Sequence, residues 1–218
     1  MMYLSRIRLN QARRGARRLL GSPHTMHGAV MASFQEAKRD LGRVLWRVDN
    51  DPGSTWLYVV SLCSPDFTHI VEEAGWPASA EGWITRSYES LLDQLAIGQR
   101  WAFRLTANPS RSDTSEGGRR FGHVTATQQE QWLLGRASKW GFSVTEAHGQ
   151  LELVVRDRVV DRFRRADGSV TLAKATFEGI LEVSSVESLR GALINGVGHG
   201  KAYGCGLITL AQPLARRR

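Results

Sequence analysis

The chain has 218 residues, of which 42% are hydrophobic, and its formal net charge is +8. This length suits one large domain or two domains of about 100 residues each, and the apolar content is sufficient for a buried core. The sequence has no apolar run of about 18 residues, no apolar segment typical of a secretion signal, and too few cysteines for a disulfide framework or a cysteine metal site. We therefore expect a cytoplasmic protein.

The charge is dominated by arginine. Lysine and arginine together number 29, against 21 aspartate and glutamate residues. Because the planar guanidinium group matches phosphate oxygens, binding of a polyanion is the leading hypothesis for such a chain. A generally basic surface is the alternative, and the distribution of the arginines along the chain decides between them.

The first stretch of regular structure is expected at residues 3–9. Polar and apolar residues alternate there as in a half-buried strand, which places Arg6 and Arg8 on one side and Ile7 on the other. A basic cluster follows on a turn or short helix, and contact with nucleic acid competes there with a solvated face. The cluster consists of Arg13, Arg14, Arg17 and Arg18.

A helix is predicted from Pro23 to about Asp40, with Ser22 as its N-cap. His24 and His27 lie three residues apart near its start and therefore share one side. A metal site would need further ligands, which are not found nearby at a useful spacing, and ordinary surface or core histidines are the plain alternative. Acid–base catalysis is the sharper hypothesis, because imidazole titrates near neutrality and a helix N-terminus favours its neutral form.

The remaining patterns up to residue 108 predict strand, strand, helix and strand. With the first strand and helix they give the order βαββαβ, which is the ferredoxin-like topology shared by RNA-recognition folds. The expected helix is residues 68–74, and the first two of these strands are residues 43–48 and 55–62. The last strand is expected as two segments, 91–95 and 100–105, joined through Gly98.

A polar, turn-rich segment at residues 108–118 indicates a domain boundary or an exposed insertion. We assign residues 1–108 to an N-terminal domain and residues 119–218 to a C-terminal domain. The second half also fits a ferredoxin-like unit, so the expected fold class is α+β with two tandem ferredoxin-like domains. Its expected elements are a helix at 127–139 capped by Thr127 with Glu130, strands at 150–155, 170–183 and 207–210, and a helix at 186–195.

An arginine-rich hairpin is predicted between the strands of the second half. Asp167-Gly168 is a strong hairpin turn, and a basic hairpin can enter a nucleic-acid groove. Asp157 and Asp161 reduce the net positive charge of the hairpin, so a hairpin that is solvated and binds no nucleic acid is the alternative. The candidate RNA-binding residues here are Arg156, Arg158, Arg162, Arg164, Arg165 and Lys174.

A glycine-rich loop occupies residues 196–206, between the last helix and the last strand. Phosphate loops run instead from strand into helix, and Lys201 is followed by Ala202 where the Walker motif needs Ser or Thr. A platform for another part of the protein or for a nucleic-acid backbone suits the geometry better, with a flexible connection as the alternative.

The combination of these features resembles the CasE-type CRISPR RNA endonucleases, the repeat-processing subunit of the type I-E Cascade complex. The matching stretches are Met2-Tyr3-Leu4-Ser5, Ser22-Pro23 with Met26-His27, and residues 101–109, 177–181 and 196–207. The resemblance implies tandem ferredoxin-like domains that bind precursor RNA at the repeat stem-loop. It also implies other Cascade subunits as partners.

The same resemblance implies cleavage at the stem base without metal or cofactor. The 2′-hydroxyl of the RNA would be the nucleophile, leaving a 5′-hydroxyl and a 2′,3′-cyclic phosphate. His27 matches the general acid–base histidine of the family. Members often carry a tyrosine at the position of His24, and His24 is the candidate partner of His27 in this chain. Some members also carry a lysine on the next helical turn, where this sequence has Met31, Ala32 and Ser33. Lys201 and the loop amides, including those of Gly198 and Gly200, are candidates to meet the phosphate charge.

Two other functions compete with this hypothesis. One is an RNA-binding scaffold with the same folds but an idle His27, for which a His27→Ala variant would change nothing. The other is a nucleotide-using enzyme working through the glycine loop, which the failed Walker spacing disfavours.

Overall fold

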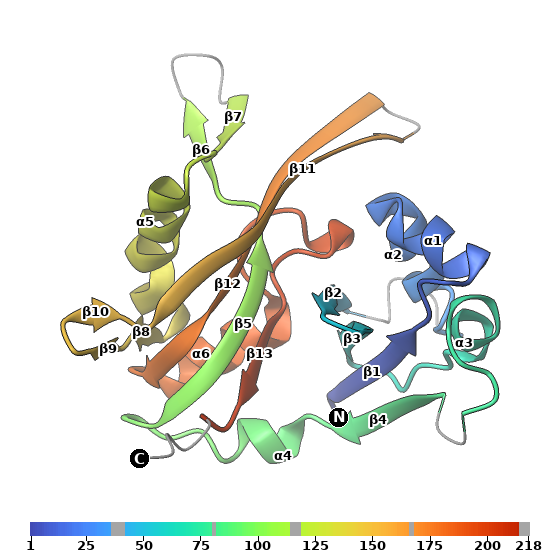
Figure 1. Cartoon of the computed structure of the whole chain (residues 1–218). Coiled ribbons are helices and arrows are strands. Elements are labelled where there is room, and N and C mark those ends of the chain that lie inside the picture. Colours follow the sequence, from blue (N-terminus) through green and yellow to red (C-terminus); the bar gives the residue numbers. More distant parts are fainter. Residues whose placement is uncertain (36–41, 80–81, 114–118, 166–167, 214–218) are drawn as a thin grey trace. The chain divides into compact units, whose positions relative to one another are not determined.

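The computed structural model describes residues 1–35, 42–79, 82–113, 119–165 and 168–213 (Figure 1). Contacts divide the chain into two units, each with its own sheet. Unit 1 contains Met1–Asp93 and Lys201–Gly204, and unit 2 contains Gln94–Gly200 and Cys205–Arg218. The expected boundary at residue 108 therefore falls inside unit 2.

Unit 1 is a complete ferredoxin-like fold. Its four-stranded antiparallel sheet has the order β2-β3-β1-β4, and its helices lie between β1 and β2 and between β3 and β4. In chain order the elements are β1 (Tyr3–Leu9), α1 (Arg14–Leu20), α2 (Pro23–Met31), β2 (Leu45–Asp51), β3 (Ser54–Ser61), α3 (Thr68–Ala74), β4 (Trp83–Ser87) and α4 (Glu89–Leu92).

Alternation along β1 decides which face of this sheet is buried. Ser5, Ile7 and Leu9 are buried, whereas Arg6 and Arg8 are exposed on the opposite face. Helices α1, α2 and α3 contribute apolar side chains to the same core as the buried face. The core residues from the helices include Ala16, Leu19, Met26, Val30, Ile70 and Val71.

Unit 2 repeats the topology with insertions. Its main sheet has the order β11-β12-β5-β13, with β8 paired to β12, and the order β5-α5-β11-β12-α6-β13 is again βαββαβ. The elements are β5 (Arg100–Ala107), β6 (Ser110–Asp113), β7 (Arg119–Gly122), α5 (Ala126–Ala137), β8 (Phe142–Val144), β9 (Glu146–Ala147), β10 (Gln150–Leu151), β11 (Leu153–Arg165), β12 (Gly168–Val183), α6 (Val186–Asn195) and β13 (Ile208–Ala211).

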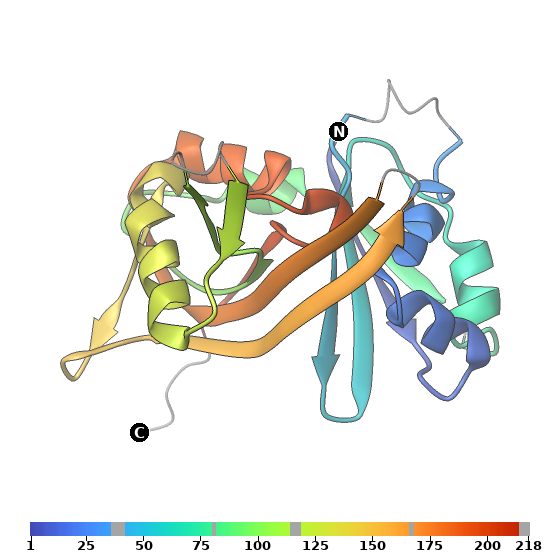
Figure 2. The same ribbon diagram turned by 90° about the horizontal axis from the view of Figure 1, so that it is seen from above.

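The β11–β12 hairpin is the longest feature of unit 2 and extends beyond its sheet (Figures 1 and 2). Strand β5 pairs only with Ala175–Glu182 of β12, so the preceding part of β12 pairs with β11 alone. In the core beneath, Trp132 of α5 stacks on Phe177 of β12 with ring centroids 6.0 Å apart. The long-hairpin prediction is confirmed, although Ala166 and Asp167 of its turn lie outside the described residues.

One strand assignment from the sequence is wrong, and the strand expected at 100–105 is confirmed but belongs to the sheet of unit 2. The segment 91–95 was expected to be a strand, but α4 runs through Leu92 and no strand follows before β5 in the described chain. The strand at 100–107 exists, but it pairs with β12 and β13 of unit 2. The fourth strand of unit 1 is instead β4, whose short pattern after a Pro- and Gly-containing loop gave no clear strand signal.

Helix ends also differ from expectation. Helix α2 was expected to reach about Asp40, but it ends at Met31 with Ala32 as its C-cap, and residues 36–41 lie outside the described part of the chain. The capping box of α5 uses Thr125 and Gln128 rather than Thr127 and Glu130. The helices at 68–74 and 186–195, the latter capped by Ser185, are confirmed.

Candidate functional site

The two candidate catalytic histidines lie on helix α2 of unit 1. Pro23 occupies its first turn, and the Ser22 hydroxyl accepts a hydrogen bond from the Thr25 amide at 3.4 Å, which fixes where the helix begins. His24 is exposed and His27 is half-buried, while Met26 on the other side of the helix is buried in the core. The three-residue spacing places the two imidazoles on the same side of the helix, where that of His24 is exposed and Nδ1 of His27 is buried.

Part of the glycine loop packs against this helix. The turn Lys201–Tyr203 contacts both α2 and β2 within unit 1. Gly204, which ends the turn, has φ +80°, and a Cβ atom there would lie 2.7 Å from Cζ3 of Trp46. Only glycine allows this approach, so the loop holds Lys201 beside the helix that carries the histidines.

Lys201 is electrostatically perturbed in this position. Partial burial, followed by the neighbouring positive charge of Arg43, lowers the pKa of its ammonium group from the ordinary 10.5. A lowered pKa makes the ammonium group a stronger acid while leaving it a donor of hydrogen bonds when charged. The residue thus combines proximity to α2 with the properties of either a phosphate ligand or a proton donor.

The glycine loop is shaped by its own hydrogen bonds. All five glycines have positive φ, and the Val197 amide donates to the Gly206 carbonyl at 2.9 Å. The Gly206 amide donates to the Thr106 carbonyl of β5 at 2.7 Å, which ties the loop to the sheet of unit 2. Since these amides are engaged, the amides of Gly198, Gly200 and Lys201 are the candidates for a ligand.

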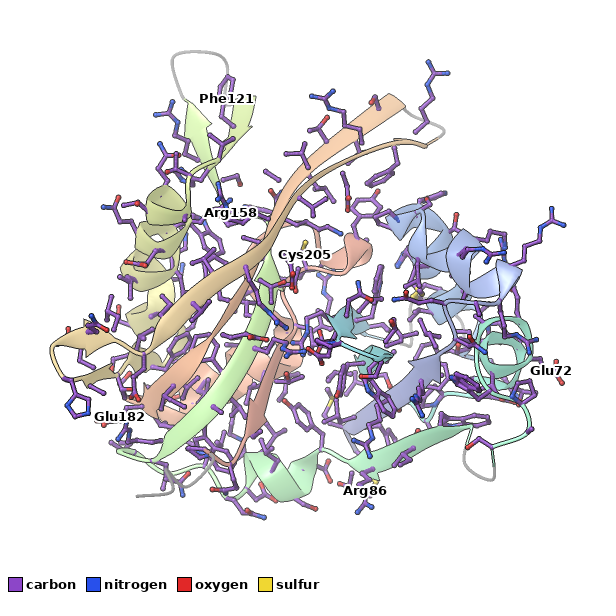
Figure 3. The ribbon with its side chains drawn as sticks, in the orientation of Figure 1. Glu72, Arg86, Phe121, Arg158, Glu182 and Cys205 are labelled. Carbon is purple, nitrogen blue, oxygen red and sulfur yellow. The ribbon has the colours of Figure 1, made fainter. Side chains whose placement is uncertain are left out.

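The loop cysteine is not a candidate nucleophile. Cys205 is completely buried, and burial raises the pKa of its thiol to about 12 (Figure 3). Because the thiolate is the reactive form, this side chain stays protonated and unreactive at neutral pH.

The basic cluster near the N-terminus is largely tied to its own unit. Arg13 donates to the backbone carbonyl of Glu73 at 3.2 Å and also to that of Glu72, and Arg18 pairs with the Glu73 carboxylate at 2.6 Å. These contacts hold α1 against the end of α3. Arg17 bonds locally to the Ala12 carbonyl, and Arg14 is exposed on α1.

The inner cations of the β11–β12 hairpin also have structural partners. Arg156 pairs across the strands with Glu178 at 2.9 Å, and Lys174 pairs with Asp161 at 2.5 Å. Arg158 follows a bulge and donates to Gln129 at 3.1 Å and to the Val124 carbonyl, which joins the hairpin to the start of α5 (Figure 3).

The outer half of the hairpin presents its arginines differently. Arg162 and Arg164 are exposed, and being two residues apart on one strand they share a face. Arg165 pairs through its backbone with Gly168, and its side chain lies outside the described part of the structure. Of the hairpin cations, Arg162 and Arg164 are therefore best placed to contact RNA.

A pocket of about 410 Å³ in unit 2 contains residues that the sequence analysis missed as site candidates. Arg136 lies over the ring of Trp132 at 5.0 Å in this pocket. The helical spacing of Trp132, Arg136 and Trp140 was visible in the sequence but indicated only a packed helix. The lining residues are Ser110, Trp132, Arg136, Lys139, Trp140, Gly198 and His199.

Within the part of the chain that the structure describes, no three His, Cys, Asp or Glu side chains are grouped so as to hold a metal ion. None of the described helices has the length and apolar character needed to cross a membrane.

Comparison with known proteins identifies relatives along nearly the entire chain. The model of a family described as CRISPR associated protein matches residues 2–212. The CRISPR-associated endoribonuclease Cse3 of Thermus thermophilus is 32% identical over 222 residues, covering 96% of this chain and all of the relative.

Solved structures agree with the fold. A structure of Thermus thermophilus Cse3 bound to an RNA representing a pre-cleavage complex has a TM-score of 0.81 at 29% identity, covering 96% of this chain and 98% of that one. The Escherichia coli K-12 protein Cas6e shares the fold, with a TM-score of 0.64 at 22% identity and coverage of 97% and 100%. Because the family model spans both units and the curated relative aligns over its full length, the chain belongs to the CRISPR-associated protein family.

Proposed function

We propose that this protein is an endoribonuclease that binds CRISPR repeat stem-loops in precursor RNA and cleaves at the stem base to give mature CRISPR RNA. The observation that carries the proposal is the arrangement on α2, where His24 and His27 share one side of a helix against which the Lys201 turn packs. The full-length similarity to an endoribonuclease supports it.

The reaction consists of a proton removal, an attack on phosphorus and the protonation of a leaving group. A base removes the proton of the 2′-hydroxyl, the 2′-oxygen attacks the adjacent phosphorus, and the bond from phosphorus to the 5′-oxygen breaks as that oxygen gains a proton. The products are a 2′,3′-cyclic phosphate and a 5′-hydroxyl. Side chains that titrate near neutrality can perform both proton transfers, so the mechanism needs no metal ion or cofactor.

His27 is the principal acid–base group in this proposal. Its half-buried position on α2 restricts its orientation, whereas His24 is exposed and serves as the second group. Lys201 meets the phosphate charge or protonates the leaving oxygen, and its lowered pKa supports the second role, because it makes the ammonium group a stronger acid. The amides of Gly198 and Gly200, in the unit 2 part of the glycine loop, are proposed to bind the RNA backbone.

Binding of the stem is assigned to the basic residues. Arg162 and Arg164 contact the RNA directly, because the other described cations of the hairpin are held by partners within unit 2. Arg14 and the exposed Arg17 of α1 provide further phosphate contacts. Other Cascade subunits are the proposed protein partners, and the cytoplasm, where the precursor is transcribed, is the proposed location.

The test uses the purified protein and a labelled repeat RNA in EDTA, beside the same RNA with a 2′-deoxy nucleotide at the cleavage position. Cleavage of the first RNA alone, with a cyclic phosphate on the upstream product, supports the proposal. Cleavage of both RNAs, or activity that only magnesium restores, contradicts it. Tight binding without cleavage of either RNA would favour a scaffold.

A further inference from the structure

The face of the unit 1 sheet opposite Ile7 carries the buried ion pair Arg47–Asp49 on β2 and, on β1, β3 and β4, an aromatic and basic surface that the proposed cleavage reaction does not use. Strand register places Arg6 opposite Tyr58 and Ile84, and Arg8 opposite Trp56. These side chains therefore share the face opposite the buried Ile7. The helices of unit 1 contribute to the core on the Ile7 side.

Two arginines on this face stack on tryptophans. The Arg6 guanidinium carbon lies 5.1 Å from the centre of the Trp56 ring, and that of Arg8 lies 5.5 Å from the Trp76 ring. Both distances are in the range of a cation–π contact, which holds the guanidinium plane over the ring while its N–H groups remain available. Trp76 is 45% exposed, an unusual exposure for so large an apolar side chain.

These pairs border a pocket of about 480 Å³ that lies entirely within unit 1. It is lined by Arg6, Arg8, Trp56, Trp76, Ala78, Ser79, Gly82, Trp83 and Ile84. Among these described residues, two are cations, three are indoles and none is acidic. Arg86, on the same strand as Ile84 and two residues from it, points outward from β4 and adds a third cation to this face (Figure 3).

The chemistry of the lining specifies the occupant. The described lining has two cations and no acidic side chain, although Asp49 pairs with Arg47 on the same face and Asp51 lines a neighbouring pocket with Arg8 and Trp76. The charge of the lining favours an anionic chain, and its flat indoles favour an occupant with flat rings. Unpaired nucleotides satisfy both conditions, because their phosphates pair with guanidinium groups and their bases stack on aromatic side chains. A duplex hides its base faces and could use only the charges.

We propose that this pocket binds unpaired nucleotides of single-stranded RNA, with Trp76 as the stacking surface and Arg6 and Arg8 as the phosphate ligands. None of the described lining residues belongs to the histidine helix or to the arginine hairpin. It would add affinity for an RNA segment that flanks a folded hairpin, and it would act equally on an RNA that contains no hairpin. The proposal therefore does not depend on the cleavage activity.

The test measures binding of the full-length protein to a fluorescently labelled ten-nucleotide oligouridine, which forms no hairpin. We expect Trp76→Ala and Arg8→Ala each to weaken this binding about tenfold, and Trp76→Phe to retain most of it. Arg8→Ala should also reduce the slope of log affinity against log salt by about one. Because Trp76 and Arg8 are exposed, both variants should keep the thermal unfolding midpoint of the parent protein.

Arg100→Ala is the matched control. Arg100 is an exposed arginine of unit 2, so its replacement by alanine removes the same charge as Arg8→Ala does. We expect it to leave oligouridine binding within about twofold. A short RNA duplex with the same number of phosphates should bind the parent and the Trp76→Ala variant equally. Three outcomes would each overturn the proposal. The Arg100→Ala and Arg8→Ala variants could lose oligouridine affinity equally, Trp76→Ala could bind oligouridine as tightly as the parent, or Trp76→Ala could lose as much affinity for the duplex as for the single strand. Unchanged RNA binding would favour a protein partner on this face.

Discussion

The two units share one topology and differ in what they add to it. In unit 1 the central hairpin, β2–β3, is compact, with strands of seven and eight residues. In unit 2 the equivalent hairpin, β11–β12, has strands of 13 and 16 residues and carries exposed arginines beyond the sheet. Unit 1 instead carries the histidine helix and the turn that holds Lys201.

The units also differ in how they use charge. Unit 1 buries an ion pair on β2, where Arg47 and Asp49 have side chains only 1% and 5% exposed and bond through two contacts of 2.6 and 2.9 Å. The ion pairs of unit 2 lie nearer the solvent, as for Arg100 with Glu152. In the proposed function, unit 1 supplies the acid–base groups and the hairpin of unit 2 contacts the RNA, and the predictions below test this division.

The largest expected effect is the separation of cleavage from binding. His27→Ala should lower the single-turnover cleavage rate by about 10²–10⁴-fold, because it removes an acid–base group. Affinity for the repeat RNA should change less than about threefold, as measured by filter binding with a 2′-deoxy substrate. A parallel loss of affinity would mean that α2 also binds RNA, and would contradict the assignment of catalysis to unit 1 and of RNA binding to the hairpin of unit 2.

The buried ion pair of unit 1 should matter more to stability than the exposed pair of unit 2. Asp49→Ala leaves the Arg47 charge buried without this carboxylate and should cost about 3–5 kcal/mol in urea unfolding. Arg100→Ala removes a half-exposed partner and should cost about 0–1 kcal/mol. Similar losses in the free energy of unfolding for the two variants would contradict the contrast in burial. As a control, replacement of Arg47 by Met together with Asp49 by Leu should recover most of the free energy of unfolding that Asp49→Ala loses.

The hairpin of unit 2 should control affinity and leave chemistry intact. We expect Arg162→Ala with Arg164→Ala to weaken repeat binding about 10- to 100-fold, while the cleavage rate at saturating protein stays near that of the parent. Arg158→Ala serves as the comparison, because its guanidinium joins the hairpin to α5. This variant should lower the thermal midpoint, and an equal loss of affinity without a change in stability would show that the inner arginine contacts RNA too.

The smallest expected effect is a shift in the pH profile of cleavage. Burial and Arg43 lower the pKa of Lys201, so its charged form disappears at a lower pH than for an ordinary lysine. If the charged form meets the phosphate, the rate should fall as the pH rises through this lowered pKa. Lys201→Arg should extend the plateau to higher pH because arginine remains charged. An identical alkaline limb in both proteins would exclude the charge of Lys201 from the reaction.

The sequence alone determined much of the architecture. Alternation in residues 3–9 was strong enough to predict which side of β1 is buried, and the periodic segments at 68–74 and 186–195 were strong enough to predict α3 and α6. The three-residue spacing of His24 and His27 required a common side on any helix, and the resemblance to CasE-type endonucleases led to the family that the comparisons show.

Only the tertiary structure decided which strand joins which sheet. The segment 100–107 reads as a strand in isolation, but its partners are β12 and β13, which are about 70 and 100 residues away in sequence. Strand β4 was missed because its side chains are only partly buried, so its pattern is weak until β1 provides its hydrogen bonds. Local patterns report which face of an element is buried, whereas pairing depends on distant segments.

The roles of the arginines were likewise decided by tertiary contacts. In the sequence, Arg156, Arg158, Arg162 and Arg164 are equivalent members of one basic run. In the structure, Glu178 and Gln129 engage the first two from β12 and α5, whereas the latter two remain exposed. Likewise, the sequence showed that residues 196–206 can turn sharply, but only the packing of Gly204 on Trp46 places Lys201 beside α2, because that contact joins residues far apart in the chain.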